Sequence, residues 1–194
     1  MRLFESEAAN KKPRYPKQTF TDLNLLIPLL DNPELKVDYD VPYELVNGTV
    51  VFELPGGEQA TIEQVLAMIL KTIKQHASKQ AGTGVRDCVL TVPSDWGMAA
   101  RTAIINAAYI AELAVLSVIS DNTAAALNYA MTRNDNEPLN VMIYNLGSGK
   151  LQVSIIKFYG YNNTENNKTI ESIDVLSHQT NSEFGGYEMD NKIA

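Results

Sequence analysis

Several features that mark particular classes of protein are scarce in this sequence. Its 194 residues include one cysteine and two histidines, so neither an internal disulfide nor a zinc site built from paired ligands is expected. Acidic residues outnumber basic ones by 23 to 16, so the basic surface that a nucleic-acid partner requires is not expected. The apolar runs stay well below the roughly 18 residues that suggest a membrane span, so no membrane segment is expected either.

The composition that remains is that of a folded domain. Hydrophobic residues make up 45% and charged residues 20% of the chain, which is enough apolar material for a packed core. Cys88 lies in an apolar run that ends at Val92, where a buried and unreactive thiol is expected. Three Asn-x-Thr motifs, at Asn47, Asn162 and Asn167, would suit a protein of the secretory pathway if they are exposed.

The first 84 residues predict a small mixed unit. Prolines punctuate the start, where only Leu23 to Leu30 is apolar enough for a short buried helix. Strand-like runs flank Asn47-Gly48, a dipeptide typical of a type I′ hairpin turn. The capping-box pattern from Thr61 to Gln64 then predicts an amphipathic helix that runs to about Ser78.

The rest of the chain reads as a strand, helix and strand followed by a hairpin. A β-rich run from 87 to 92, a helix from 98 to 113 and an apolar run from 115 to 119 predict a βαβ crossover. Two further strands are predicted at 141–144 and 153–156. Tyr161 to Lys168 predicts a surface loop, 170–176 another strand, and Gly185-Gly186 the start of a short final helix.

Two places in this second part could carry chemistry. Gly147-Ser148-Gly149, between two strands, could expose backbone N–H groups to phosphate oxygens, although most such hairpins are merely tight turns. Asp121 follows the strand of the βαβ unit at the edge where ligands gather, or it is simply a helix cap. Together with Asn145, which ends the strand before the glycines, Asp121 could hold a hydrated cation against phosphates.

Four segments together resemble the ATPase domain of the seventy-kilodalton heat-shock chaperones. They are Leu90-Thr91-Val92-Pro93-Ser94-Asp95-Trp96, Arg101, the run from Asp121 to Tyr129, and the Gly147-Ser148-Gly149 hairpin. Asp-Asn-Thr-Ala, Gly-Ser-Gly and the run from Phe184 to Met189 look most like the large glucose-regulated, hypoxia-upregulated branch of the endoplasmic reticulum.

This resemblance implies an α/β chain with the fold shared by actin, hexokinase and heat-shock ATPases. The chain would be a fragment of lobe I, in which a mixed sheet is flanked by helices. Residues 1–84 would form a peripheral α+β subdomain, and residues 85–194 the core subdomain with the βαβ unit and the phosphate hairpin. The family's first phosphate loop and its second lobe would lie outside the chain, so ATP or ADP with magnesium would bind weakly or not at all.

The resemblance also assigns roles to individual residues. Asp121 matches a glutamate linked indirectly to magnesium, while Gly147, Ser148, Gly149 and Lys150 would form the nucleotide-binding turn. Asn145 stands where the family has a catalytic aspartate, and Asn24, by a looser alignment, where it has a catalytic lysine, so both positions are degenerate. Lys150 replaces a threonine and could compensate electrostatically. Pro93 and Arg101 match positions that relay the nucleotide state, or they are a strand terminator and a solvated helix charge.

Other side chains carry less specific expectations. Glu112 follows a predicted helix at a place where the family commonly has a glycine. Trp96, Tyr109 and Tyr129 are expected to be core or lobe-interface aromatics, because nothing basic surrounds them.

Several functions remain open from the sequence. The leading one is a partial nucleotide-binding domain with weak or absent hydrolysis. Its parent would act in the reticulum lumen as a holdase for unfolded polypeptides and as nucleotide-exchange partner of an ordinary heat-shock chaperone. The alternatives are an active ATPase with rearranged groups, a nucleotide-free interaction module, a sugar or acetate kinase of the same fold for which no catalytic aspartate is seen, and a cytoplasmic location.

Overall fold

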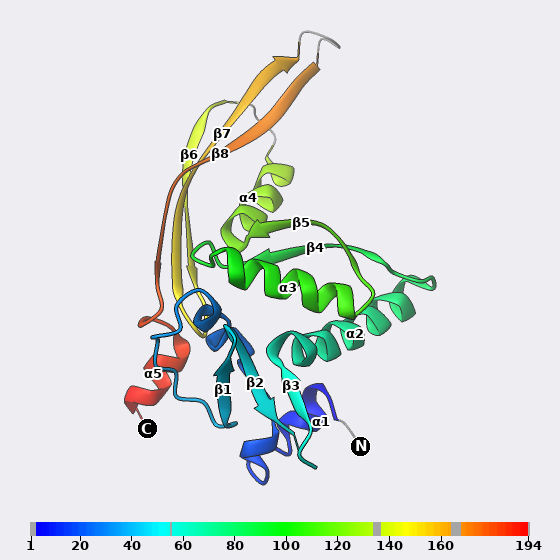
Figure 1. Ribbon diagram of the computed structural model, residues 1–194. Coiled ribbons are helices and arrows are strands. Elements are labelled where there is room, and N and C mark those ends of the chain that lie inside the picture. The colour runs from blue at the N-terminus through cyan, green and yellow to red at the C-terminus, as the bar shows by residue number, and fades with distance from the viewer. Residues whose placement is uncertain (1–2, 55, 134–136, 164–167, 194) are drawn as a thin grey trace. The chain divides into compact units, whose positions relative to one another are not determined.

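The structure, a computed structural model, describes residues 3–54, 56–133, 137–163 and 168–193 (Figure 1). The chain divides into two compact units, which we call the first and second unit. The first comprises Met1–Leu90 with Trp96–Ser117, and the second comprises Thr91–Asp95 with Val118–Ala194. The expected division at residue 84 concerns subdomains of a longer domain and stays a prediction.

The first unit combines a small antiparallel sheet with two long helices. Its sheet has the order β1-β2-β3. The predicted buried helix near Leu23 takes the form of two 3₁₀ turns, while α1 and β3 were not predicted. The elements are α1 (Glu5–Ala9), η1 (Pro16–Gln18), η2 (Leu23–Leu25), η3 (Ile27–Leu30), β1 (Tyr43–Val46), β2 (Thr49–Glu53), β3 (Gln59–Thr61), α2 (Ile62–Ala81) and α3 (Met98–Ile110).

Local sequence signals in this unit are confirmed by the backbone. Asn47 and Gly48, between β1 and β2, have φ values of 52° and 79°, as a type I′ turn requires. Thr61 and Gln64 form the predicted capping box, with Gln64 Oε1 accepting from the Thr61 N–H at 3.0 Å. Helix α2 continues past Ser78 to Ala81, where Gly82 supplies a left-handed cap with φ 67°.

The core of the first unit has two parts. The first part consists of side chains from η3, the residue before it and β2, each at most 2% exposed: Leu26, Ile27, Leu29, Val50 and Phe52. Helices α2 and α3 lie side by side (Figure 1), and the contact is made by Ala67, Ala107 and Ala111 with Leu66, Leu70 and Leu113 around them. Alanines at this contact let the two backbones approach closely.

The N-terminus of helix α3 is capped by a carboxylate that is distant in sequence. Asp31 accepts from the N–H groups of Gly97 at 2.8 Å, Ala99 at 3.0 Å and Ala100 at 3.4 Å. A negative charge there satisfies N–H groups that have no partner within the helix and complements the helix dipole. The cap of α3 is therefore Asp31, the residue that follows η3, and not Gly97, which directly precedes the helix.

The C-terminus of the same helix is capped by a cation that is also distant in sequence. Lys74 of α2 donates to the carbonyl oxygens of Ala111 at 3.3 Å and Glu112 at 2.8 Å. Helix α3 ends at Ile110, before the predicted Leu113, because Glu112 takes a left-handed conformation with φ 58°. Charges of opposite sign thus stabilise the two ends of one helix.

Strands β4 (Asp87–Val92) and β5 (Ala114–Ser120) pair with each other. Their arrows point the same way in Figure 1, as expected of strands joined by a crossover helix. The predicted strand, helix and strand are confirmed. Cys88 in β4 is half-buried instead of fully buried, and burial together with the neighbouring Asp87 raises the pKa of its thiol.

The second unit is a curved three-stranded antiparallel sheet with a helix against one face (Figure 1). The helix α4 packs on the sheet through Ala126, which contacts Ile156 and Phe158; all three are at most 2% exposed. The elements are α4 (Asp121–Thr132), β6 (Leu139–Leu146), β7 (Leu151–Asn163), β8 (Lys168–Asn181) and α5 (Gly186–Ile193).

The predicted surface loop from Tyr161 to Lys168 is wrong at both of its ends, and its residues 164–167 lie outside the described residues. Strand β7 continues to Asn163 and pairs there with Lys168, the first residue of β8. The intrinsic preference of asparagine is for turns, but a strand that is already paired with its neighbour can continue through several asparagines. In the part of the chain that the structure describes, no helix is long and apolar enough to span a membrane.

Candidate functional site

The candidate site is built around the turn that joins β6 to β7. Leu146 and Leu151 form the last strand pair, and the Gly147 N–H donates to the Lys150 carbonyl at 3.0 Å. The N–H of Gly147 is therefore used to close the turn. A phosphate oxygen would have to be held by the N–H groups of Ser148 and Gly149.

One side of this turn is covered by the start of α5. The N–H groups of Gly186 and Tyr187 donate to the carbonyls of Gly147 at 3.0 Å and Ser148 at 2.8 Å. A Cβ added at Gly185 would lie 2.4 Å from the Ser148 carbonyl oxygen, so only glycine allows this approach. The turn is thus backed by a second segment of backbone and held in one conformation.

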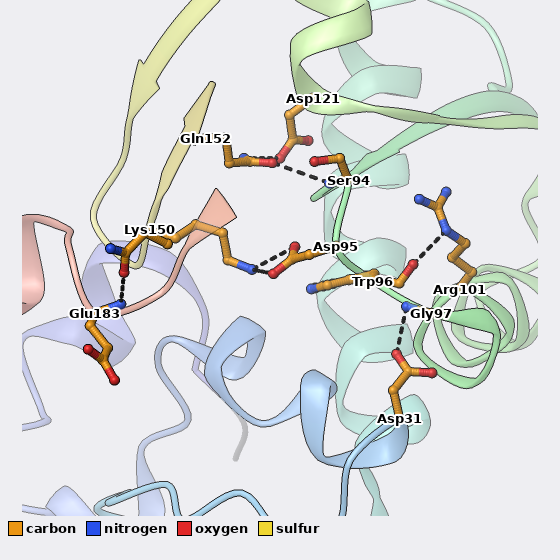
Figure 2. Close-up of polar contacts among 11 residues, drawn as sticks. Asp31, Ser94, Asp95, Trp96, Gly97, Arg101, Asp121, Lys150, Gln152 and Glu183 are labelled. Atoms are coloured by element: carbon orange, nitrogen blue, oxygen red, sulfur yellow. Dashed lines mark hydrogen bonds and ion pairs between the residues drawn. The ribbon is translucent and has the colours of Figure 1, made fainter. Parts of the chain in front are cut away.

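Lys150, the cation of the turn, is already paired. Its ammonium lies 3.0 and 2.9 Å from the two carboxylate oxygens of Asp95, which is part of the same unit (Figure 2). The Lys150 side chain is 13% exposed, so the pair is partly shielded from water. The positive charge that was expected to compensate for lost catalytic groups is balanced by a neighbouring carboxylate.

Gln152 links three parts of the second unit and was missed by the sequence reasoning. Its side chain accepts from the Ser94 N–H at 3.2 Å and donates to Asp121 Oδ2 at 3.1 Å (Figure 2). It is 5% exposed and lies directly opposite Asn145 in the β6–β7 register. Asn145 and Gln152 are each two residues from the turn, on either side of it, so a regular hairpin places them opposite each other. This spacing is the signal that could have identified Gln152.

Asp121 lies where the strand-end argument expected it, at the start of α4 directly after β5. The alternative that it merely caps the helix is wrong. Ser120 is the cap residue, since its Oγ accepts from the Thr123 N–H at 3.3 Å. The neighbouring Asn122 is not a cap either, because it is buried and donates to Ser154 Oγ at 2.9 Å. The Asp121 carboxylate is thereby left to bond with Gln152.

The remaining predicted residues are divided between the two units. Asn24 is exposed in η2 of the first unit, whereas Asp121, Asn145 and the turn belong to the second. Pro93 follows directly after β4, and Arg101 donates from Nε to the Trp96 carbonyl at 2.9 Å. The relay roles of Pro93 and Arg101 stay predictions.

The three aromatic residues differ in environment. Trp96 is 8% exposed, as expected of the core, and Tyr129 packs edge-on against the Phe158 ring. Tyr109 is 80% exposed on α3, so a core position for it is wrong and an interface role stays a prediction.

The residues around Gln152 suit a divalent cation poorly. Asp121 supplies the single negative charge of the cluster that it forms with Ser94, Asn145 and Gln152, and one of its oxygens already accepts an amide N–H. Within the described ranges, no three acidic, histidine or cysteine side chains lie close enough together to hold a metal ion. Magnesium favours charged oxygen ligands, which neutral amides replace here.

Comparison with known proteins identifies the family. The family described as Hsp70 protein matches residues 2–194. The chain belongs to the Hsp70 family. Within it, this Hsp70 chain is 31% identical over 202 residues to Hypoxia up-regulated protein 1 of Danio rerio, covering 99% of the chain and 20% of that protein.

Other relatives agree with this assignment. The human Hypoxia up-regulated protein 1 is 32% identical over 81% of the chain and 17% of that protein. The chaperone protein DnaK of Thermus thermophilus is 35% identical over 79% of the chain and 23% of that protein. This Hsp70 chain therefore spans roughly a fifth of the length of these relatives. The mixed α/β structure agrees with a fragment of lobe I of the actin-like ATPase fold.

Proposed function

We propose that this chain is part of the nucleotide-binding domain of a large Hsp70-type chaperone, and that it binds ATP or ADP with weak or absent hydrolysis. The observation that carries the proposal is the backed turn from Gly147 to Lys150, next to which Asn145 and Gln152 present amides. The turn offers backbone donors to phosphate, whereas the amides can neither take a proton from water nor neutralise positive charge.

Weak hydrolysis follows from what phosphoryl transfer requires. The reaction depends on positioning and on electrostatic stabilisation of the transferring group. Replacing a carboxylate by Asn145 and a cation by Asn24 is therefore expected to lower the rate by several powers of ten. An active ATPase with rearranged groups would need the Lys150 ammonium for this work. The ion pair with Asp95 argues against that alternative, because it already neutralises the ammonium.

For the full-length protein, we propose the roles that the resemblance implies. It would be a holdase for unfolded polypeptides and a nucleotide-exchange partner of an ordinary heat-shock chaperone, in the lumen of the endoplasmic reticulum. Support comes from the several relatives named Hypoxia up-regulated protein 1. A cytoplasmic location is the alternative, since the bacterial DnaK matches at similar identity.

Calorimetric titration of the full-length protein with ATP tests the proposal. Gly149→Arg fills the turn and is expected to abolish binding, whereas Gly84→Arg, at a glycine with open space around it, is the matched control. Loss of binding only in Gly149→Arg, with the circular dichroism unchanged, supports the phosphate turn. Equal binding by all three proteins would refute the phosphate turn as the site, and binding by none would favour a nucleotide-free interaction module. Single-turnover hydrolysis then separates binding from catalysis.

A further inference from the structure

We infer that this site takes its nucleotide as the free anion, without a divalent cation, and that Gln152 is the positioning residue that determines this. The inference rests on the proposed function, namely that ATP or ADP binds at the turn from Gly147 to Lys150. It departs from the expectation that Asp121 is linked to magnesium.

The orientation of the Gln152 amide follows from its two partners. The Ser94 N–H needs an acceptor, so the carbonyl oxygen Oε1 faces it at 3.2 Å. The amide nitrogen Nε2 must then face Asp121, to which it donates at 3.1 Å. Since Gln152 is 5% exposed, a cation that displaced this bond would leave a buried donor without a partner, which is costly.

The charge around the cluster leads to the same conclusion. Asn145 and Gln152 are neutral, and the charges of Lys150 and Asp95 cancel in their ion pair. Among the described residues of this cluster, only the Asp121 carboxylate is left to attract a cation, and one of its oxygens already accepts from an amide. Magnesium in ATPase sites is held by one or two carboxylates together with phosphate oxygens and water. Within the described part of the chain, Asp121 alone would have to supply the carboxylate share, and it is already engaged with Gln152.

Gln152→Glu is the variant that tests the role of the amide. A glutamate keeps an oxygen that can accept from the Ser94 N–H, so the link to the end of β4 is retained. It replaces the donor opposite Asp121 with a second carboxylate, which is the arrangement that attracts a divalent cation. Gln179→Glu is the matched control, because the substitution adds the same charge to the same sheet. Gln179 is exposed on β8 and lies opposite Val153 instead of Gln152 in the strand register.

Binding of Mn²⁺ alone to the full-length proteins, followed by electron paramagnetic resonance, gives the first result. We expect Gln152→Glu to bind Mn²⁺ at least about tenfold more tightly than the wild type, and Gln179→Glu to bind no more tightly than the wild type. Tight binding by the wild type would overturn the inference. A gain in Gln152→Glu no larger than that in Gln179→Glu would also overturn it.

ATP titration of the wild type in magnesium and in EDTA gives a second result that does not depend on any variant. We expect the dissociation constant to change by less than about threefold between the two buffers. A loss of about tenfold or more in EDTA would overturn the inference and leave the proposed function standing. Failure to bind ATP in both buffers would refute the proposed function, and the Mn²⁺ titration would still decide whether the protein holds a cation.

Discussion

Glu112 is a residue held in a conformation that suits glycine. Its φ is 58°, its N–H donates to the Tyr109 carbonyl at 2.9 Å, and the Leu113 N–H donates to the Ala108 carbonyl at 2.9 Å. These two bonds form a Schellman motif, in which the left-handed position is usually a glycine. The unfavourable backbone conformation of a non-glycine residue there costs about 1–2 kcal/mol.

We therefore expect Glu112→Gly to stabilise the end of α3 by about 1 kcal/mol, after allowance for the greater freedom of glycine in the unfolded chain. The salt bridge from Glu112 to Lys74 is exposed at 3.5 Å and contributes little. Hydrogen exchange of the last turn of α3 should slow by about fivefold. Glu112→Ala is the control, since it removes the same salt bridge and keeps the strain; equal exchange in both variants would refute the explanation.

Sequence reasoning succeeded for residues whose partners lie nearby in the chain. The Asn47-Gly48 turn and the Thr61 to Gln64 capping box are confirmed because each is determined within four residues. Gln152 and Asp31 were missed because their partners lie 31 to 69 residues away. Neither residue is unusual in its local sequence, so only the fold reveals what each one binds.

At the scale of elements, the β6–β7 turn depends on the segment that precedes α5. Gly185 leaves no room for a side chain, because an added Cβ would lie 2.4 Å from the Ser148 oxygen and 2.8 Å from the Lys150 nitrogen. Both neighbours are backbone atoms, which cannot move aside as a flexible side chain could.

Gly185→Ala is expected to destabilise this contact by about 1–3 kcal/mol, the usual cost of overpacking. Hydrogen exchange in both the turn and α5 should then accelerate together. Gly147→Ala is the matched control, since its nearest neighbour would lie at an ordinary contact distance of 3.5 Å. Unchanged exchange in Gly185→Ala would mean that α5 does not support the turn.

The hairpin of β7 and β8 marks the limit of element prediction. The patterns located both strands, but the asparagines predicted a loop from Tyr161, where pairing in fact carries β7 on to Asn163. Whether a polar strand continues depends on its partner strand, and no window of a single strand contains that information.

At the scale of the whole molecule, membership of the Hsp70 family was predictable from short motifs in the right order. The fold class followed from that resemblance and from the strand, helix and strand. The arrangement of polar groups around Asp121 did not follow, because the hydrogen bonds of Gln152 depend on three separate segments meeting.

The proposed reticulum location predicts a glycan on Asn47. This residue is exposed in a two-residue turn followed by Thr49, whereas Asn167 and the side chain of Asn162 lie outside the described residues. Protein made in a eukaryotic secretory pathway should lose one glycan in Asn47→Gln, seen as a gel shift before glycosidase treatment. Thr49→Ala should give the same shift, because it destroys the acceptor motif. No difference from the wild type in either variant would refute glycosylation at this turn.

The cap that Asp31 places on α3 has a consequence for how the chain matures. The carboxylate and the Gly97 N–H that it binds are 66 residues apart, so the helix leaves the ribosome long after its cap residue has been made. During synthesis, Asp31 is therefore available before α3 appears, and α3 gains this cap when the two segments meet. The full stability of the start of α3 thus depends on a residue made 66 positions earlier in the chain.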